Sequence, residues 1–275
     1  MSRYIRPATL AEAVAALAEP QATLLAGGTE LYRAPGPRPS GLVIDLAFLE
    51  SLREIAVEAA GVRLGALVRW SDLLETELPA WILPLLQAAK AIASPQVRHA
   101  GTLGGNLSAR SGERDGAVAL LVLDARVALS GPAGERELPL ARFLERAPGA
   151  SDLLTHVLVP TPTGMLHAGF RKLGLRRALG PAVGAVAAGL AVDASATIRQ
   201  ARLAVGAPGL TPCRLPTLEE RLHGRSIGED LAAFLEPTAL AMLHLRGDGD
   251  CGADYRRHAL AVLLRRLLAD LRESR

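Results

Sequence analysis

The sequence predicts an α+β protein of two domains, and three observations support this prediction. The chain has 275 residues and is 49% hydrophobic, which is enough to bury a large core. Strand-like and helix-like runs alternate in the first half, whereas three long strand-like runs followed by helices fill the second. The segment Pro160-Thr161-Pro162-Thr163-Gly164 separates the two parts, so we expect domains at residues 1–163 and 164–275.

The first 50 residues predict a small β-α-β unit. Thr9-Leu10-Ala11-Glu12 fits a capping box, with Thr9 as the N-cap and Glu12 folding back toward it. A short helix to about Leu17 is expected to follow. Thr23 to Ala26 is predicted to be a buried strand, and Leu42 to Leu46 is an apolar run that predicts another strand. This part forms a first lobe of about residues 1–52.

The second lobe, about residues 53–163, is expected to mix strands and helices. The glycine loop that opens at Ser94-Pro95 is predicted to interrupt them. In chain order the predicted elements are a hairpin of 54–57 and 62–66, a helix N-capped by Ser71 or Asp72, a helix from Pro79 to Ile92, a buried helix from Gly116 to Asp124, and strands from Arg126 to Leu129 and from Leu153 to Val159.

The second domain is predicted to be a three-stranded antiparallel sheet covered by helices. Its strand-like runs are Leu166 to Leu173, Val183 to Asp193 and Thr197 to Val205, spaced as in a meander. Helices are expected over Leu215–Leu222 and Gly228–Leu235. A long amphipathic helix is predicted from Asp254 to Leu271, because its leucines recur on one face with arginines opposite.

Composition excludes several classes of function. A net charge of +3 with scattered arginines predicts a solvated surface and no nucleic-acid footprint, and 3% aromatic residues are too few for a base-stacking platform. No apolar run has the length of a membrane span and the N-terminus lacks a signal-peptide core, so we expect a cytoplasmic protein. Cys213 and Cys251 are too few for a structural zinc site or an iron–sulfur cluster. Any metal that this protein works with is therefore expected on another chain.

Two glycine loops carry the functional signal. Residues 24–30 read Leu-Leu-Ala-Gly-Gly-Thr-Glu, so a strand-like run leads directly into two glycines and a threonine. Residues 102–106 read Thr-Leu-Gly-Gly-Asn. Glycine lets successive backbone N–H groups converge on an anion, as phosphate-binding loops do. Two such loops predict a ligand long enough to touch both, such as a dinucleotide whose diphosphate is held from both sides.

Each of these residues also has a purely structural interpretation. Gly27-Gly28 alone would be read as a tight turn, and Gly104-Gly105-Asn106 alone as a hairpin turn. Asp115 could cap the helix that follows it, and Lys172 could be an ordinary surface lysine. The six histidines are interpreted as surface or structural residues, because none is paired at a ligand spacing.

The motifs resemble a known family. Ala26-Gly27-Gly28-Thr29 and Thr102-Leu103-Gly104-Gly105-Asn106, the latter preceded by Ser94-Pro95-Gln96-Val97-Arg98, resemble the FAD-binding medium subunit of molybdenum hydroxylases, the xanthine dehydrogenase and carbon monoxide dehydrogenase group. The resemblance extends from Ile5 to the last helix. In the second domain it rests on Phe170-Arg171-Lys172 with Arg176-Arg177, on Ala204-Val205-Gly206-Ala207 with Thr211-Pro212, and on Asp254-Tyr255-Arg256-Arg257-His258.

This resemblance implies the fold and the cofactor. The fold would be a two-lobed FAD-binding domain of the vanillyl-alcohol-oxidase (PCMH) type, followed by the smaller C-terminal domain. Leu154 would pack beside the FAD, Asp115 would reach a ribose or adenine group, and Lys172 would approach the flavin. The FAD pyrophosphate would be wrapped by Leu24, Leu25, Ala26, Gly27, Gly28, Thr29 and Glu30, and met from the other side by Thr102, Gly104, Gly105 and Asn106.

The resemblance also implies an electron-transfer subunit without catalytic residues of its own. A large molybdenum-cofactor subunit would oxidise the substrate, and a small subunit with [2Fe–2S] clusters would relay electrons to the FAD. NAD, a quinone or O2 would then accept them, and the complex is expected to be a heterotrimer that dimerises. A lysine near the flavin would favour its anionic reduced form.

The sequence departs from the family pattern at one place and leaves two alternatives open. Asp115 is followed by Gly116-Ala117-Val118, where relatives usually carry a proline pair, and residues 109–114 are unusually charged. The adenosine end of FAD would then be held differently. The alternatives are a subunit that has lost FAD and serves in assembly, and a stand-alone flavin oxidoreductase of the same fold. The second would need acid–base residues over the flavin, and the sequence offers no candidate.

Overall fold

The computed structural model describes residues 3–32, 39–109, 114–145, 152–175, 182–235 and 240–273. The chain divides into two compact units, and neither is continuous in sequence. The first unit comprises Met1–Thr76, Pro95–Ala109 and Ala125–Pro160, and the second comprises Glu77–Ser94, Arg110–Asp124 and Thr161–Arg275. The fold class is confirmed as mixed α and β. The domain boundary at residues 163 and 164 stays a prediction, because two stretches before it group with the second unit.

The first unit begins with the predicted β-α-β arrangement. Strands β1 (Arg3–Ile5), β3 (Leu42–Asp45) and β2 (Thr23–Leu25) form a parallel sheet in that order, and helix α1 (Leu10–Ala16) packs with it around a common apolar core. Thr9 is confirmed as the N-cap, because its hydroxyl accepts from Glu12 N. The Glu12 carboxylate folds back as expected, but it accepts from Ala8 N and not from Thr9 N as in a capping box. Strand β2 was predicted to be buried, but its residues are only half-buried because it forms one edge of the sheet.

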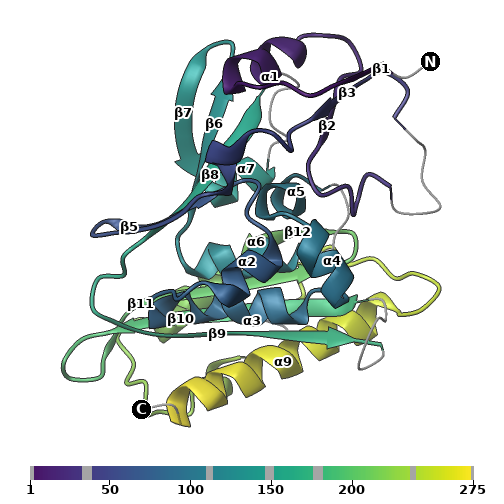
Figure 1. Ribbon diagram of the computed structural model, residues 1–275. Helices are drawn as coiled ribbons and strands as arrows, with labels where there is room; N and C mark the ends of the chain where they lie inside the picture. The colour runs from purple at the N-terminus through teal and green to yellow at the C-terminus, as the bar shows by residue number, and fades with distance from the viewer. Residues whose placement is uncertain are drawn as a thin grey trace. The chain divides into compact units, whose positions relative to one another are not determined.

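A five-stranded antiparallel sheet completes the framework of the first unit (Figure 1). Its order is β4 (Ile55–Glu58), β5 (Gly61–Gly65), β8 (Leu153–Pro160), β6 (Arg126–Gly131) and β7 (Gly134–Pro139). The predicted hairpin is β4–β5. Strand β7 was not predicted, because its sequence has no apolar alternation and its side chains are almost all exposed. Helix α7 (Leu140–Glu145) follows it.

Short helices connect these sheets, and two predictions are corrected here. Helix α2 (Trp70–Glu75) was expected to be capped by Ser71 or Asp72, but it begins after Arg69, and the Asp72 carboxylate accepts from Arg69 N at 2.8 Å. Residues 95–108 were expected to be a loop. They form helices α4 (Pro95–Ala100) and α5 (Leu103–Ser108). Elsewhere in the first unit, η1 (Glu50–Arg53) is a single 3₁₀ turn.

The second unit is built on a four-stranded antiparallel sheet, one strand more than predicted. Its order is β12 (Leu210–Arg214), β11 (Ile198–Ala207), β10 (Ala182–Val192) and β9 (Met165–Gly174). The three predicted strands are confirmed. Strand β12 was not predicted, because Thr211-Pro212 is typical of a turn. Proline is tolerated here because β12 is an edge strand, where one backbone N–H needs no partner.

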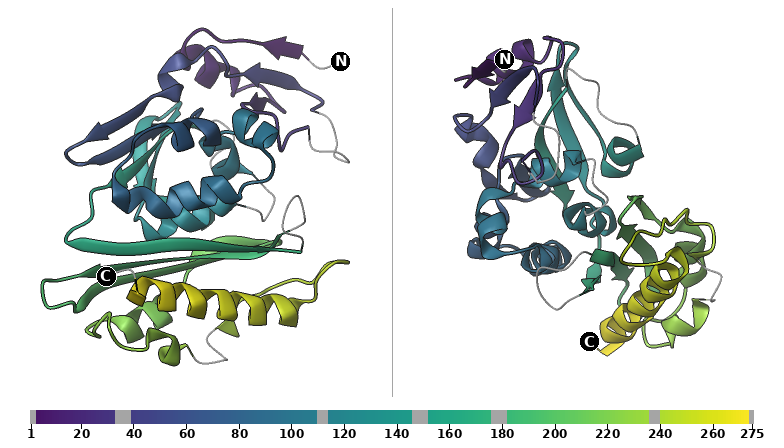
Figure 2. Two further views of the ribbon diagram at one scale, coloured as in Figure 1. Left: turned by 60° about the horizontal axis from the view of Figure 1, so that its bottom comes forward. Right: turned by 90° about the vertical axis from the view of Figure 1, so that its right-hand side faces the viewer.

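Helices cover both faces of this sheet, so β10 is buried at every position. Figure 2 shows α9 (Ala253–Glu273) along one face and α3 (Leu83–Ala91) with α6 (Asp115–Val122) on the other. Glycines allow this close approach. A Cβ at Gly189 would lie 3.0 Å from the Val122 carbonyl oxygen, and one at Gly206 would lie 2.6 Å from a Val118 methyl.

The remaining predicted helices are confirmed with changes at their ends. The helix expected from Pro79 to Ile92 is a 3₁₀ turn, η2 (Ala80–Ile82), followed by α3. Helix α8 (Pro216–Leu222) forms as predicted. The stretch expected to be helical over residues 228–235 contains only the 3₁₀ turn η3 (Leu231–Phe234), which packs with α8 and α9 in one apolar core.

A buried arginine fastens the long helix to the sheet. The Arg256 side chain is 1% exposed and donates to the backbone carbonyls of Ala182 and Val183, at 3.4 and 3.2 Å. It also pairs with the Asp248 carboxylate. This residue of the Asp254–His258 motif therefore braces the first turn of α9 against the start of β10.

Candidate cofactor site

The two glycine loops meet inside the first unit. We call residues 24–30 the first loop and residues 102–106 the second loop. A Cβ at Gly27 would lie 1.9 Å from the Ala100 carbonyl oxygen and 3.0 Å from the Gly101 Cα, and one at Gly101 would lie 3.3 Å from the Thr29 hydroxyl oxygen. The first loop therefore touches the residues that lead into the second, and only glycine permits this contact. Ala100, the partner in this contact, was not among the predicted site residues.

The first loop presents unpaired backbone donors. The N–H groups of Ala26, Gly27, Gly28 and Thr29 donate to no acceptor in the part of the chain that the structure describes. Gly28 has a φ of +68°, a left-handed conformation that favours glycine, and its carbonyl accepts from Tyr32 N at 3.0 Å. The loop is half-buried to exposed. A run of unpaired N–H groups at the end of a parallel strand is a typical anion-binding arrangement.

The second loop differs from the expectation that its amides reach a diphosphate. Leu103 N donates to the Val68 carbonyl and Gly104 N to the Ala66 carbonyl, both at 2.8 Å. Gly105 N donates to the Thr102 hydroxyl at 3.1 Å, and Asn106 N to the Thr102 carbonyl at 3.0 Å. These bonds attach the loop to the segment after β5 and cap helix α5. The amides of this loop are therefore occupied within the protein.

Two features of the second loop remain available to a ligand. The Asn106 side-chain oxygen is buried, yet it has no hydrogen-bond partner among the described residues. Burying a polar atom without a hydrogen-bond partner costs free energy, so we expect a ligand or a water molecule to donate to this oxygen. Gly105 is exposed, and a Cβ built on it would meet only the Thr102 hydroxyl, at 2.9 Å. Gly104 instead packs against Ala66, which its Cβ would approach to 2.8 Å.

These groups fit the chemistry of FAD. Its diphosphate oxygens accept hydrogen bonds and carry negative charge, and the first loop offers neutral donors that need no side chain. Its hydroxyls and ring N–H group donate hydrogen bonds, for which the Asn106 oxygen is an unused acceptor. Glu30 is exposed at the end of the first loop. Leu154 lies in the same unit on β8, buried and paired with Leu129.

Asp115 and Lys172 form an ion pair in the second unit. The Lys172 ammonium lies 2.5 Å from the Asp115 carboxylate, and the side chains are 17% and 7% exposed. Asp115 is not the N-cap of α6, which is Arg114, but it lies in the first turn, where a negative charge is favourable. Lys172 is therefore no ordinary surface lysine. Burial also lowers the pKa of the neighbouring Arg114. The roles predicted for both residues toward the cofactor stay predictions.

Parts of the sequence pattern fall outside the described residues. Arg176-Arg177 and residues 110–113 of the charged segment lie there. Among the described residues, no group of three or more His, Cys, Asp or Glu side chains is placed to hold a metal ion. The described helices include none that is both long and apolar enough to cross a membrane.

The fold and the two loops define an α+β protein equipped to bind a diphosphate-containing cofactor, and comparison with known proteins identifies the family. Residues 1–162 match the model of the FAD binding domain in molybdopterin dehydrogenase, and residues 169–271 match that of the CO dehydrogenase flavoprotein C-terminal domain. The chain belongs to this family of FAD-binding dehydrogenase subunits. It is a flavoprotein subunit of an oxidoreductase.

Individual relatives align with this chain over most or nearly all of its length. Nicotinate dehydrogenase FAD-subunit from Eubacterium barkeri is 31% identical over 88% of this chain and 84% of its own length. Caffeine dehydrogenase subunit beta from Pseudomonas sp. (strain CBB1) is 30% identical over 97% and 93%. A solved structure of carbon monoxide dehydrogenase from Hydrogenophaga pseudoflava superposes with a TM-score of 0.86 at 28% identity, covering 97% of this chain and 96% of that one.

Proposed function

We propose that this chain is the electron-transfer subunit of a molybdenum hydroxylase complex. It would hold FAD, take electrons from [2Fe–2S] clusters on a small subunit and deliver them to an external acceptor such as NAD, a quinone or O2. A large molybdenum-cofactor subunit would oxidise the substrate. The observation that carries the FAD role is the run of backbone amides at residues 26–29, which have no acceptor within the described ranges and are held in place by the contact of Gly27 with Ala100.

The two loops would contribute different contacts to FAD binding. The first loop would donate its N–H groups at residues 26–29 to the diphosphate, because these donors have no acceptor among the described residues. Thr102 would act indirectly, since its hydroxyl caps α5 and fixes the direction of the loop. Gly105 would leave room for the ligand, and the Asn106 oxygen would accept from one of its hydroxyl or N–H groups.

This chain's contribution to the reaction is positional and electrostatic. Bound FAD supplies one-electron chemistry that no side chain of the protein provides. Lys172, held by Asp115 at 2.5 Å, is a cation of fixed position in the second unit. If it faces the flavin as the family resemblance implies, its charge would favour the reduced, anionic form of the cofactor.

The test of the binding site uses Gly105→Val and Asn106→Ala. A Cβ at position 105 would meet only the Thr102 hydroxyl, at 2.9 Å, so the valine has to shift that capping hydroxyl but no other group, and it occupies space proposed for FAD. The control is Gly249→Val, since nothing lies within 4 Å of a Cβ at that position. We expect a loss of visible flavin absorbance in Gly105→Val, at least ten-fold weaker FAD binding in Asn106→Ala, and no change in the control. Full FAD retention in Gly105→Val with a normally folded apoprotein would refute the site.

The proposed complex is tested separately by purification from the native host. We expect the chain to co-purify with a molybdopterin-containing subunit and an iron–sulfur subunit, both identified by mass spectrometry and metal analysis. A chain that binds FAD but purifies alone would indicate a stand-alone flavin oxidoreductase. A chain that joins the complex without flavin would indicate an assembly subunit.

A further inference from the structure

Tyr32 lies two residues after the first loop and folds back onto it. Its N–H group donates to the Gly28 carbonyl oxygen at 3.0 Å, so residues 28–32 form one turn. A Cβ built on Gly28 would lie 3.2 Å from the Tyr32 Cδ2 atom and 3.6 Å from its Cε2 atom. One edge of the aromatic ring therefore lies against Gly28, whose N–H group is one of the donors at residues 26–29 that have no acceptor among the described residues.

The rest of the Tyr32 side chain is open to a ligand. The residue is 55% exposed, and its hydroxyl has no hydrogen-bond partner in the part of the chain that the structure describes. On the same side of Gly28, a Leu25 methyl would lie 3.3 Å from the built Cβ. A single exposed aromatic residue needs no functional explanation. This one differs because its ring lies on the backbone that presents donors to the proposed cofactor, so a molecule bound there meets the ring as well.

The distance from the Gly28 amide to the ring fits the part of FAD next to its diphosphate. A Cβ lies about 2.5 Å from the nitrogen of its own residue, so the ring edge lies within about 6 Å of Gly28 N. A phosphate oxygen that accepts from this N–H group lies about 2.9 Å from the nitrogen. In FAD a hydroxylated carbon chain is attached at each end of the diphosphate, the ribityl chain toward the flavin and the ribose toward the adenine. Either chain can reach the ring and its hydroxyl from a phosphate held at Gly28.

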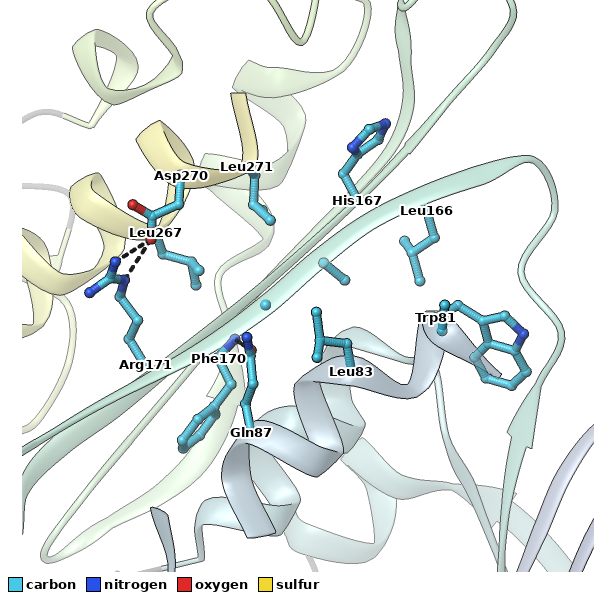
Figure 3. A pocket seen from close by; sticks show the side chains of 13 residues that line it. Trp81, Leu83, Gln87, Leu166, His167, Phe170, Arg171, Leu267, Asp270 and Leu271 are labelled. Carbon is cyan, nitrogen blue, oxygen red and sulfur yellow. Dashed lines mark hydrogen bonds and ion pairs between the residues drawn. The ribbon is translucent and has the colours of Figure 1, made fainter. Parts of the chain in front are cut away.

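A cavity of about 440 Å³ in the second unit provides a contrast, because its polar groups already have partners. Figure 3 shows this cavity beside β9. The Arg171 guanidinium pairs there with the Asp270 carboxylate, and the Gln87 side-chain oxygen accepts from Phe170 N at 2.7 Å. These groups give no reason to expect a ligand. The donors beside Tyr32 do, since they have no acceptor within the described ranges.

We propose that Tyr32 is a further FAD-binding residue, whose ring packs along one of the two hydroxylated chains beside the diphosphate and whose hydroxyl forms a hydrogen bond with that chain. This inference rests on the proposed function, because it takes FAD as the ligand of the first loop. A tyrosine suits both contacts. Its ring offers an apolar surface to the C–H groups of the chain, and its phenol group can donate to or accept from a hydroxyl.

Chemical acetylation of the unmodified full-length chain tests the contact without any substitution. N-acetylimidazole acetylates accessible phenol groups, and mass spectrometry of peptides locates the products. Tyr255 is the internal reference, because it is also 55% exposed and lies in the second unit. We expect bound FAD to slow acetylation of Tyr32 about ten-fold or more, the effect of a site that is occupied most of the time, and to leave the rate at Tyr255 unchanged. Equal rates at Tyr32 with and without bound FAD would overturn the proposal.

Two variants then separate the hydroxyl from the ring. Tyr32→Phe keeps the packing on Gly28 and removes only the hydroxyl, so we expect an unchanged melting temperature of the apoprotein and about three- to ten-fold weaker FAD binding, the effect of one hydrogen bond. Tyr32→Ala removes the ring as well and should weaken FAD binding further. The matched controls are Tyr255→Phe and Tyr255→Ala, in which FAD affinity should not change.

Binding of FMN and of ADP to the same variants identifies the chain that Tyr32 contacts. FMN carries the ribityl chain, and ADP carries the ribose, so Tyr32→Phe should weaken the binding of one fragment and not of the other. Unchanged FAD affinity in both Tyr32 variants would overturn the proposal and leave the ring as a cover for Leu25. That result would leave FAD binding by the unmodified chain intact, whereas failure of the proposed function would remove it.

Discussion

Replacing Gly27 by alanine should separate the two glycine loops. The new Cβ would lie 1.9 Å from the Ala100 carbonyl oxygen and 2.7 Å from its carbonyl carbon. An ordinary carbon–oxygen contact needs roughly 3.3 Å, so the two backbones would have to part by about 1.4 Å. Both contacting groups are main chain, and no rotamer change can relieve the overlap. We expect the free energy of unfolding to fall by about 1–3 kcal/mol, the cost of overpacking a close contact.

Urea unfolding of the apoprotein, followed by circular dichroism, measures this cost, and titration with FAD measures the effect on binding. We expect FAD affinity to fall at least ten-fold, which corresponds to about 1.4 kcal/mol, because the free amides lose their fixed direction. Gly105→Ala is the matched control in the second loop. Its Cβ meets only the Thr102 hydroxyl at 2.9 Å, so the unfolding free energy of the apoprotein should change by less than about 1 kcal/mol. An unchanged unfolding midpoint in Gly27→Ala would refute the contact on which the site depends.

Three further results are expected. Lys172→Met should destabilise the protein by about 3 kcal/mol, because it removes the ammonium group that pairs with the buried Asp115 carboxylate. Adding Asp115→Asn should restore part of the loss in urea unfolding, and additive losses would contradict the pairing. Arg256→Met should cost about 2 kcal/mol or more by removing donors from buried carbonyls, and an unaltered melting temperature would argue against its bracing role. Burial lowers the pKa of His156, and the charge of Arg63 lowers it further. The neutral His156 therefore contributes fully to the free energy of unfolding above the pKa of an unfolded histidine, about 6.5, and this contribution is lost as pH falls through the lower pKa of the folded protein. His156→Phe should therefore reduce the drop in unfolding free energy between pH 7 and pH 5.5, and an identical drop would exclude His156 as its source.

Much of the fold could be predicted from periodicity and caps. The Thr9 N-cap, the buried helix after Asp115 and the leucine face of the last helix each follow from local sequence, and each is confirmed. Strand β7 could not be predicted, because it exists through pairing with β6 and its exposed charged residues carry no strand pattern. Strand β12 was hidden by Pro212, whose tolerance depends on the edge position that the topology gives it.

The candidate site was predictable in part. The glycines and Asn106 could be named from their motifs, but which amides remain free depends on tertiary contacts. Leu103 and Gly104 lose theirs to the carbonyls of Val68 and Ala66, a pairing that no local pattern reveals. Likewise, the ion pair of Lys172 with Asp115 joins residues 57 positions apart, and its two members had been assigned separate roles.

The way the chain passes between its two compact units limits how it can be dissected. It crosses from one unit to the other at residues 76–77, 94–95, 109–110, 124–125 and 160–161. A fragment that begins at Thr161 would therefore lack α3 and α6, and one whole face of the sheet that contains β10 would be exposed to water. Such a fragment should aggregate, so a biochemist who wants the second unit in its folded form should express the entire polypeptide.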